Sequence, residues 1–127
     1  ITVGSFGLFK NSMSSDFSNT NFTLHFAYDH LEMDGYRDNS QYNKNSYFLN
    51  SSYRLNENTL LSVVLNHTNY AAEIPSSIGK TDYLENPSKA AFTWSQAKGY
   101  EDDQQNLAGI NLTHKFSKKW ENSTSVF

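Results

Sequence analysis

Arg37 is the residue whose type and surroundings best suit a charged ligand. It stands in the segment DGYRDNS, between Asp34 and Asp38, in a stretch rich in turn-forming residues. A guanidinium group forms paired hydrogen bonds with carboxylates, so Arg37 can hold an anionic chelate at a loop surface. The alternative is that Arg37 pairs with its own acidic neighbours and fixes the loop, and we favour this second interpretation.

Several aromatic side chains also stand in the polar stretches of the chain, where they can stack on a substrate. Packing of the loops against one another is the favoured alternative. Together with Arg37, they form the predicted substrate-binding set, which consists of Tyr36, Arg37, Tyr83, Trp94 and Tyr100.

The acidic run Glu101–Asp103 offers oxygen ligands to a hard cation, but it lacks the spacing of a calcium-binding loop. We therefore expect a solvated acidic turn. The histidines His25, His30, His67 and His114 lack a metal-ligand spacing, and the chain has no cysteine. No catalytic constellation is present either, so we expect no enzyme activity, no cofactor and no metal site.

The elements that position these residues alternate apolar and polar side chains, which is typical of β-strands. In Asn106–Phe116 one face carries Ala108, Ile110, Leu112 and Phe116. Leu60–Tyr70, Asn21–Asp29 and Asn45–Leu55 alternate similarly, and Ile1–Lys10 and Glu121–Phe127 are strand-like. Because about 9–11 residues of a tilted strand cross a bilayer, the pattern fits a transmembrane barrel. A strand of a soluble sandwich alternates in the same way and remains the alternative.

The connections between the expected strands alternate in length. Short ones fall near residues 11–20, 56–59 and 117–120, whereas 30–44 and 71–105 are long. Outer-membrane barrels have short periplasmic turns and long extracellular loops, so this alternation favours a barrel. In the longer loop, Asn86 suits a helix N-cap, Pro87 the first helical position and Gly99 the C-terminal cap. We expect one short helix between them.

The bulk composition excludes some classes of protein. A net charge of −3 over 127 residues argues against a nucleic-acid partner, and no run of eighteen apolar residues is present to form a membrane-spanning helix. Ile1 and Phe127 both fall in strand-like segments. About six strands cannot close a barrel whose minimum is about eight, so we expect residues 1–127 to be one part of a larger barrel domain.

The motifs GSFG (4–7), DGYRDNS (34–40), IPSSI (74–78), NPSKAAFTW (86–94), GYEDD (99–103) and TSVF (124–127) occur in this order. Taken together, they resemble the barrel of TonB-dependent outer-membrane receptors, in particular the ferric-dicitrate receptor type. The likeness runs over most of the chain. DGYRDNS and the block from IPSSI to AAFTW are its most distinctive parts.

This resemblance implies an all-β fold, an antiparallel transmembrane β-barrel with twenty-two strands in that family and a plug domain in its lumen. The plug and its TonB box have no counterpart in these residues. The implied function is active transport of a scarce nutrient, most often a ferric chelate such as a siderophore or a citrate complex, across the bacterial outer membrane. The implied partners are outer-membrane lipid and, through the plug, the TonB–ExbB–ExbD complex.

Two other functions are compatible with the residues, namely a passive outer-membrane porin and a soluble β-rich adhesin or carbohydrate-binding module. The long loop 71–105 bears on the ligand, because it carries more acidic than basic side chains. Such a loop would not steer an anionic ferric citrate, so citrate is in doubt even within the receptor family.

Overall fold

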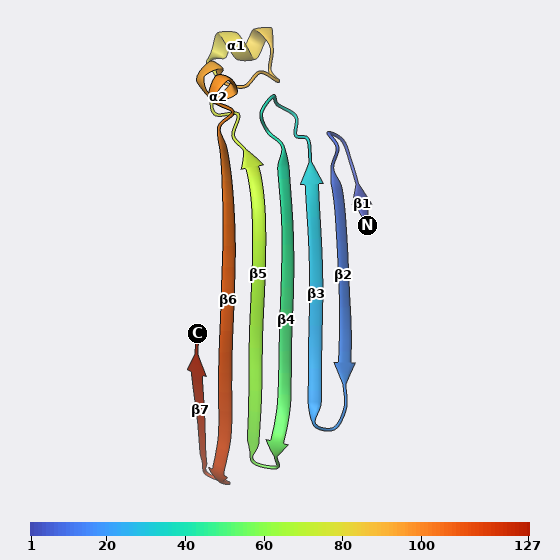
Figure 1. The fold of residues 1–127 in the computed structure, drawn as a ribbon, viewed down its shortest axis with the longest axis vertical. Coiled ribbons are helices and arrows are strands. Elements are labelled where there is room, and N and C mark those ends of the chain that lie inside the picture. The colour runs from blue at the N-terminus through green and yellow to red at the C-terminus, as the bar shows by residue number, and fades with distance from the viewer. The chain divides into compact units, whose positions relative to one another are not determined.

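The computed structural model describes residues 1–127 and contains one antiparallel sheet in which each strand lies beside the next in sequence (Figure 1). The sheet has seven strands in the order β1 to β7 and is open. Their bounds are β1 Thr2–Val3, β2 Phe9–Ser18, β3 Phe22–Met33, β4 Tyr42–Asn56, β5 Thr59–Glu73, β6 Tyr100–Ser117 and β7 Trp120–Val126. The all-β, antiparallel prediction is confirmed, with one strand more than expected.

The central strands are long. β4 and β5 have 15 residues each and β6 has 18, whereas strands of globular proteins usually have about 3–10. Each of them extends several residues beyond the predicted bounds into stretches that had been assigned to loops. The sequence does not predict this extension, because the strand ends are polar. The alternation of apolar residues therefore stops before the backbone pairing does.

The predicted turn at Asn11–Asn19 is wrong, because β2 runs through Phe9–Ser18. The segment is rich in serine and asparagine, which favour turns. In the sheet Asn11 and Ser15 share one face of β2 with Phe9, Met13 and Phe17, and the other face is entirely polar. The predicted strand Ile1–Lys10 is interrupted by a tight turn. Thr2 and Val3 form β1 and pair with β2, and the N–H of Gly4 donates a hydrogen bond to the Leu8 carbonyl in the turn between them.

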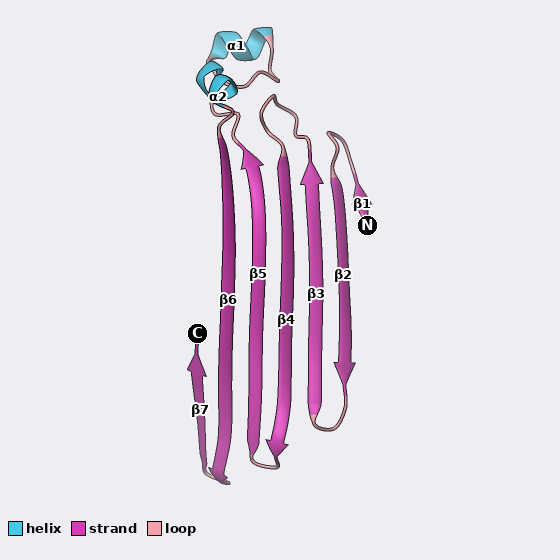
Figure 2. Ribbon diagram, viewed as in Figure 1, coloured by secondary structure: helices cyan, strands magenta, loops and turns pink.

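The long connection between β5 and β6 contains two short helices instead of one (Figure 2). They are α1, Lys80–Glu85, and α2, Phe92–Ala97. Asn86 caps the C-terminus of α1 through its backbone N–H and is therefore not the N-cap of a longer helix. Lys98, with φ of 48°, adopts the left-handed conformation that ends α2, one residue before the predicted Gly99. No helix in the chain has the length and apolarity needed to cross a membrane.

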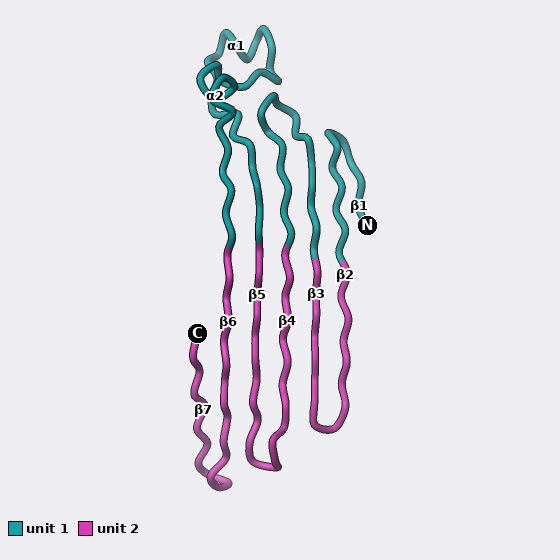
Figure 3. Tube along the Cα trace, in the orientation of Figure 1, with its two compact units in different colours: residues 1–12, 29–45, 69–104 teal, residues 13–28, 46–68, 105–127 magenta.

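The residues of the chain form two compact units, each described here by itself (Figure 3). Unit 1 consists of residues 1–12, 29–45 and 69–104, and unit 2 consists of residues 13–28, 46–68 and 105–127. The connections 4–8, 34–41 and 74–99 all belong to unit 1, whereas the short turns 19–21, 57–58 and 118–119 all belong to unit 2. The predicted alternation of connection lengths is confirmed, and it separates the two units.

One face of unit 2 is apolar, and we call it the apolar face. Ring contacts join its strands: Phe17 to Phe22 at 6.1 Å, Phe22 to Tyr53 at 6.5 Å and Tyr28 to Tyr47 at 4.9 Å between centroids. Large residues of β2, β3 and β4 therefore meet on one side of the sheet, and among them are the predicted apolar sets of β3 and β4. The face also includes Met13, Leu24, Phe26, Leu49, Leu55, Leu61, Val63, Leu65, Ala108, Ile110, Leu112, Phe116, Trp120 and Val126.

The opposite face of unit 2, the polar face, is joined by hydrogen bonds between side chains on neighbouring strands. The Ser52 hydroxyl lies 2.8 Å from that of Ser62, and His25 Nδ1 lies 2.7 Å from Asp16 Oδ1. On the last strand pair, Asn111 Nδ2 donates to Ser123 Oγ at 2.8 Å. The large apolar exceptions on this face are Phe48, Leu60, Val64, Leu107 and Phe127.

Unit 2 has no apolar core, because it consists only of strands and short turns. Ala90, in unit 1, is the only hydrophobic residue of the chain that is buried. On the apolar face Ile110 keeps 55% of its surface exposed and Phe116 keeps 70%. A folded chain gains most of its stability by removing such surface from water. The apolar face therefore requires a covering that the chain itself does not provide.

Candidate functional site

Arg37 fastens the 34–41 connection to the 74–99 connection within unit 1. Its Nη1 donates a hydrogen bond to the Ser76 carbonyl at 2.6 Å, and its Nε and Nη2 donate to the Lys89 carbonyl at 3.1 and 2.7 Å. No carboxylate forms an ion pair with Arg37, so the favoured pairing with Asp34 or Asp38 is wrong. Charge-assisted hydrogen bonds from the guanidinium group to backbone carbonyls fix the two connections instead.

Asn39 reinforces the same junction. Its Nδ2 donates to the Ile74 carbonyl at 2.9 Å and to the Gly99 carbonyl at 2.8 Å, so one amide holds both ends of the 74–99 connection. The backbone N–H of Asp38 donates to the Ser88 carbonyl at 2.7 Å. A φ of 54° at Asn39 lets the turn present these donors, and asparagine tolerates this conformation better than most residues.

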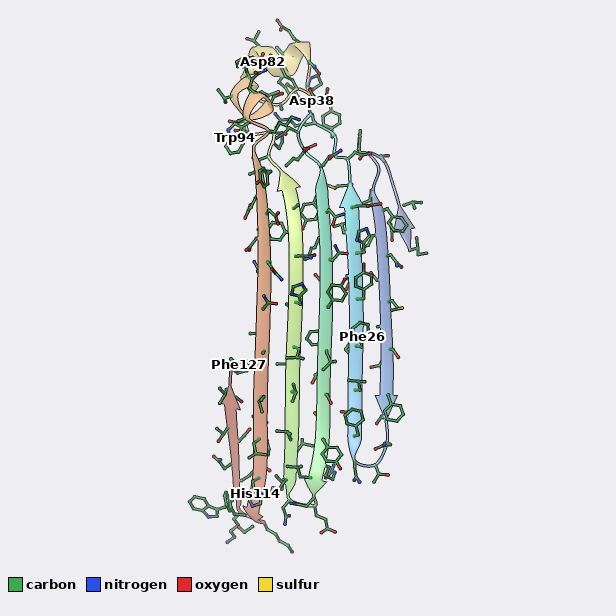
Figure 4. All side chains as sticks on the ribbon, in the orientation of Figure 1. Phe26, Asp38, Asp82, Trp94, His114 and Phe127 are labelled. Atoms are coloured by element: carbon green, nitrogen blue, oxygen red, sulfur yellow. The ribbon has the colours of Figure 1, made fainter.

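An ion pair joins α1 to the segment that follows it. Lys89 Nζ lies 2.5 Å from Asp82 Oδ1, and Figure 4 places Asp82 on α1. The hydrogen bond and the negative charge of Asp82 raise the pKa of Lys89 above its ordinary value. Lys89 therefore stays protonated and is engaged through both its side chain and its carbonyl group.

Trp94, labelled on α2 in Figure 4, packs directly on Gly99. A Cβ atom at Gly99 would lie only 1.9 Å from Trp94 Cε3, so no other residue fits without moving the indole ring. The N–H of Gly99 also donates to the Trp94 carbonyl at 3.0 Å. The sequence assigned Gly99 to a helix cap, whereas the structure uses it for this close approach.

We expect Gly99→Ala to destabilise the 74–99 connection by about 1–3 kcal/mol, the usual cost of overpacking. Proteolysis within residues 74–99 should become faster, and the fluorescence of Trp94 should shift as its ring moves. Gly79→Ala is the matched control, because nothing lies within 4 Å of a Cβ atom at Gly79. Equal proteolysis of the two variants would contradict the packing of Trp94 on Gly99.

A cavity of about 760 Å³ lies in unit 1. Its lining comes from the 4–8 turn, the ends of β3, β4 and β5, the C-terminal end of α2 and the start of β6. The charged residues of the lining are Glu32, Asp34, Glu73 and Lys98, and its aromatic residues are Tyr42 and Tyr100. Ligand sites for small molecules usually have volumes of about 300–1,000 Å³, so this cavity is large enough to hold one.

A second hollow of about 540 Å³ in unit 1 has a more polar lining, which includes Tyr36 and Arg37. Of the predicted substrate-binding residues, Tyr100 therefore lines the first cavity, and Tyr36 and Arg37 line the second. Tyr83 and Trp94 line neither of them. Tyr36 packs edge-on against Phe6 with ring centroids 5.3 Å apart, which supports the loop-packing alternative for this residue.

The acidic run Glu101–Asp103 lies in β6, so the predicted acidic turn is wrong. Glu101 Oε1 accepts a hydrogen bond of 2.6 Å from the Tyr70 hydroxyl. Successive side chains of a strand point to opposite faces, so Asp102 points away from Glu101 and Asp103. Nowhere in the chain do three or more histidine, aspartate or glutamate side chains form a group that could hold a metal ion.

Each histidine hydrogen-bonds a polar side chain of a neighbouring strand. His30 Nδ1 lies 2.9 Å from Asn45 Oδ1, and His67 Nδ1 lies 2.7 Å from Asn106 Oδ1. His114, near the end of β6 in Figure 4, lies 2.8 Å from the Thr59 hydroxyl. These hydrogen bonds link neighbouring strands, so the histidines have a structural role in the sheet.

Sequence reasoning missed Asn39 and most of the cavity lining, including Glu32, Tyr42 and Lys98. DGYRDNS was recognised as a loop, and an asparagine in a turn can adopt a positive φ, but nothing local shows where its amide donates. Glu32 and Tyr42 stand at strand ends that were assigned to a loop. Correct strand bounds would have placed both beside the 74–99 connection.

The fold and this site define the chain as an open antiparallel β-sheet protein with a cavity of small-molecule size among its longer connections. The sequence matches no protein-family model and no curated protein.

Proposed function

We propose that the chain is part of the barrel of a TonB-dependent outer-membrane receptor that imports a scarce nutrient, a ferric chelate in the first instance. The observation that carries this proposal is the exposed apolar face of unit 2, whose opposite face is polar. A membrane barrel needs an apolar outer surface and tolerates a polar lumen. The ordered motifs from GSFG to TSVF supply the link to the receptor family.

The dimensions of the apolar face support a membrane location. Its apolar set on β4 runs from Tyr47 to Leu55 and on β6 from Ala108 to Phe116, about nine residues each, close to the roughly 9–11 that a tilted strand needs to cross a bilayer. Aromatic residues stand towards its two limits, with Tyr28 and Tyr47 at one and Phe22 and Tyr53 at the other. Aromatic girdles at both interfaces are a feature of outer-membrane barrels.

The connections support an orientation. Unit 1 contains the longer connections, and its strand residues include the polar His30, Asn45 and Asn69. In the proposed receptor, unit 1 faces the outside and its cavity belongs to the substrate vestibule. Unit 2 crosses the membrane and ends in periplasmic turns.

The open edges of the sheet are consistent with a proposal in which further strands complete a barrel. An unpaired strand edge in lipid leaves backbone N–H and C=O groups without partners, which costs several kcal/mol per group. We propose that neighbouring strands of a larger barrel, twenty-two in the receptor family, satisfy these groups. The polar face, with Asp16, His25 and Asn111, then surrounds the plug.

The proposed mechanism is gated uptake without covalent chemistry. A substrate that binds the outward-facing receptor shifts its population towards a form that couples to the TonB–ExbB–ExbD complex. The residues of this chain form part of the substrate-binding surface, and the energy for transport comes from that complex.

The test has two parts. We expect the protein to remain with outer membranes after a high-pH wash, to dissolve in detergent and to migrate differently in gels when unheated, as folded barrels do. We also expect uptake of a ferric chelate to stop when the TonB–ExbB–ExbD complex is removed. Monomeric, folded protein in plain buffer would instead favour a soluble adhesin or carbohydrate-binding module.

A passive porin is the remaining alternative. It would pass the membrane part of the test, but its transport would continue without the TonB–ExbB–ExbD complex. The two parts together therefore separate the receptor from both alternatives.

A further inference from the structure

We propose that the 760 Å³ cavity of unit 1 binds a small ligand of net positive charge, such as a chelate that carries a free amine. This inference rests on the proposed receptor function and narrows its substrate class. It replaces the anionic ligand that Arg37 alone suggested.

The charges of the lining carry the inference. Glu32, Asp34 and Glu73 face the cavity, and Lys98 is the only basic residue of its lining. Glu73 is fixed there, since its Oε2 accepts a hydrogen bond of 3.1 Å from the N–H of Gln41. Carboxylates around a concave surface concentrate a negative potential and attract cations.

Two basic groups of the connections around the cavity are already engaged. The guanidinium group of Arg37 donates to the Ser76 and Lys89 carbonyls, and the ammonium group of Lys89 pairs with Asp82. An anionic ligand would therefore meet the cavity carboxylates with only Lys98 to oppose their repulsion.

The wider charge distribution of the chain points in the same direction. Most of the 13 acidic residues of the chain belong to unit 1, including Glu101 and Asp103 on β6, and they outnumber the basic residues of that unit. Over distances of about 8–10 Å such charges still act on an approaching ligand at physiological salt. The approach of a ligand to unit 1 and its binding in the cavity would then both favour a positive charge.

An aromatic residue of the lining fits a cation as well. Tyr100 keeps 68% of its surface exposed, whereas the ring of Tyr42 is stacked on Tyr70, with ring centroids 6.3 Å apart. The electron-rich faces of aromatic rings attract ammonium groups, and the effect grows when water is excluded. Tyr100 belonged to the predicted set, and the structure gives it this role beside Glu73.

The test uses the protein purified from its native membrane in detergent and three probes that share one ferric chelate and differ in a single terminal group. These are a ferric trihydroxamate chelate with a free primary amine, its neutral N-acetyl derivative and its negatively charged N-succinyl derivative. We expect the amine form to bind at least tenfold more tightly than the N-succinyl form, by quenching of intrinsic fluorescence. Equal or tighter binding of the N-succinyl form, or no binding of any probe, would overturn the proposal.

The double variant Glu32→Gln/Glu73→Gln tests whether this cavity causes the preference for the amine form over the N-succinyl form. It removes two negative charges and keeps the side-chain size. We expect the ratio of the two affinities to fall towards one. Glu57→Gln, in the 57–58 turn of unit 2, is the control and should keep the full preference. An unchanged ratio in the double variant would place the selectivity elsewhere and overturn the proposal.

Failure of this inference and failure of the receptor function are distinguishable. Protein that passes the membrane and uptake tests but prefers the N-succinyl form would remain a receptor with a different substrate class. Protein that fails those tests can still be titrated with the three probes, since the cavity belongs to unit 1 of the folded chain.

Discussion

Val63→Arg is expected to make folding into a lipid bilayer less favourable by about 2–4 kcal/mol, the cost of a basic side chain near the midplane on the outer surface of a barrel. Val63 lies on β5, on the same face as Leu61 and Leu65 and towards the middle of the apolar face. The guanidinium group would have to enter hydrocarbon or pull water and headgroups towards it. Denaturant titration of the protein in lipid vesicles measures the loss.

Asn66→Arg is the matched control, because Asn66 lies on the same strand but on the polar face. We expect a change within about 1 kcal/mol, since substitutions on the lumen side are tolerated. Equal losses for the two variants would mean that both faces are packed, as in a soluble sandwich. A small effect of Val63→Arg would mean that the apolar face does not meet lipid.

Local alternation made the residues of the apolar face predictable. The sets Tyr47, Leu49, Tyr53 and Leu61, Val63, Leu65 repeat with period two. The sheet places both on one face, because Tyr47 contacts the ring of His67 and the alternate residues Ser52 and Ser62 hydrogen-bond on the other face. The β2 strand escaped prediction because its Ser-rich sequence contains only Phe9, Met13 and Phe17 as large apolar residues. Pairing with β3 overrides the preference of serine for turns.

The helical region was only partly predictable. Asn86 and Pro87 form a strong local signal for a helix start, yet Asn86 closes α1 and α2 begins after Ala91. Asparagine suits helix starts and ends alike, so the signal was ambiguous. The N–H of Ala91 donates to the Pro75 carbonyl at 2.8 Å, a contact that fixes this segment and that no local pattern reveals.

The candidate site was hardest to predict because its bonds join distant residues. Arg37 binds carbonyl groups 39 and 52 residues away, and Asn39 binds the Gly99 carbonyl 60 residues away. The sequence showed Arg37 between two acidic neighbours and therefore suggested a local ion pair. Every residue has a backbone carbonyl, so the residue types Ser76 and Lys89 do not indicate that their carbonyls bind Arg37. Only the fold identifies them as partners.

Arg37→Ala is expected to free the 74–99 connection from the 34–41 connection. The variant loses the hydrogen bonds from Nη1 to the Ser76 carbonyl and from Nε and Nη2 to the Lys89 carbonyl. Hydrogen bonds with a charged partner contribute about 1.5–3 kcal/mol each, and Arg37 is only half-buried, so we expect a total loss of about 2–3 kcal/mol. At about 1.4 kcal/mol per factor of ten, local opening should become roughly thirtyfold more frequent or more.

Amide hydrogen exchange of residues 74–99 measures this opening directly. Arg37→Lys should recover part of the protection, because an ammonium group can donate to one of the two carbonyls but cannot span both. Arg54→Ala, at the end of β4 in unit 2, removes the same positive charge elsewhere and should leave exchange in 74–99 unchanged. If Arg37→Ala kept full protection but abolished binding of an anionic chelate, Arg37 would be a ligand contact, and its bonds to Ser76 and Lys89 would be incidental.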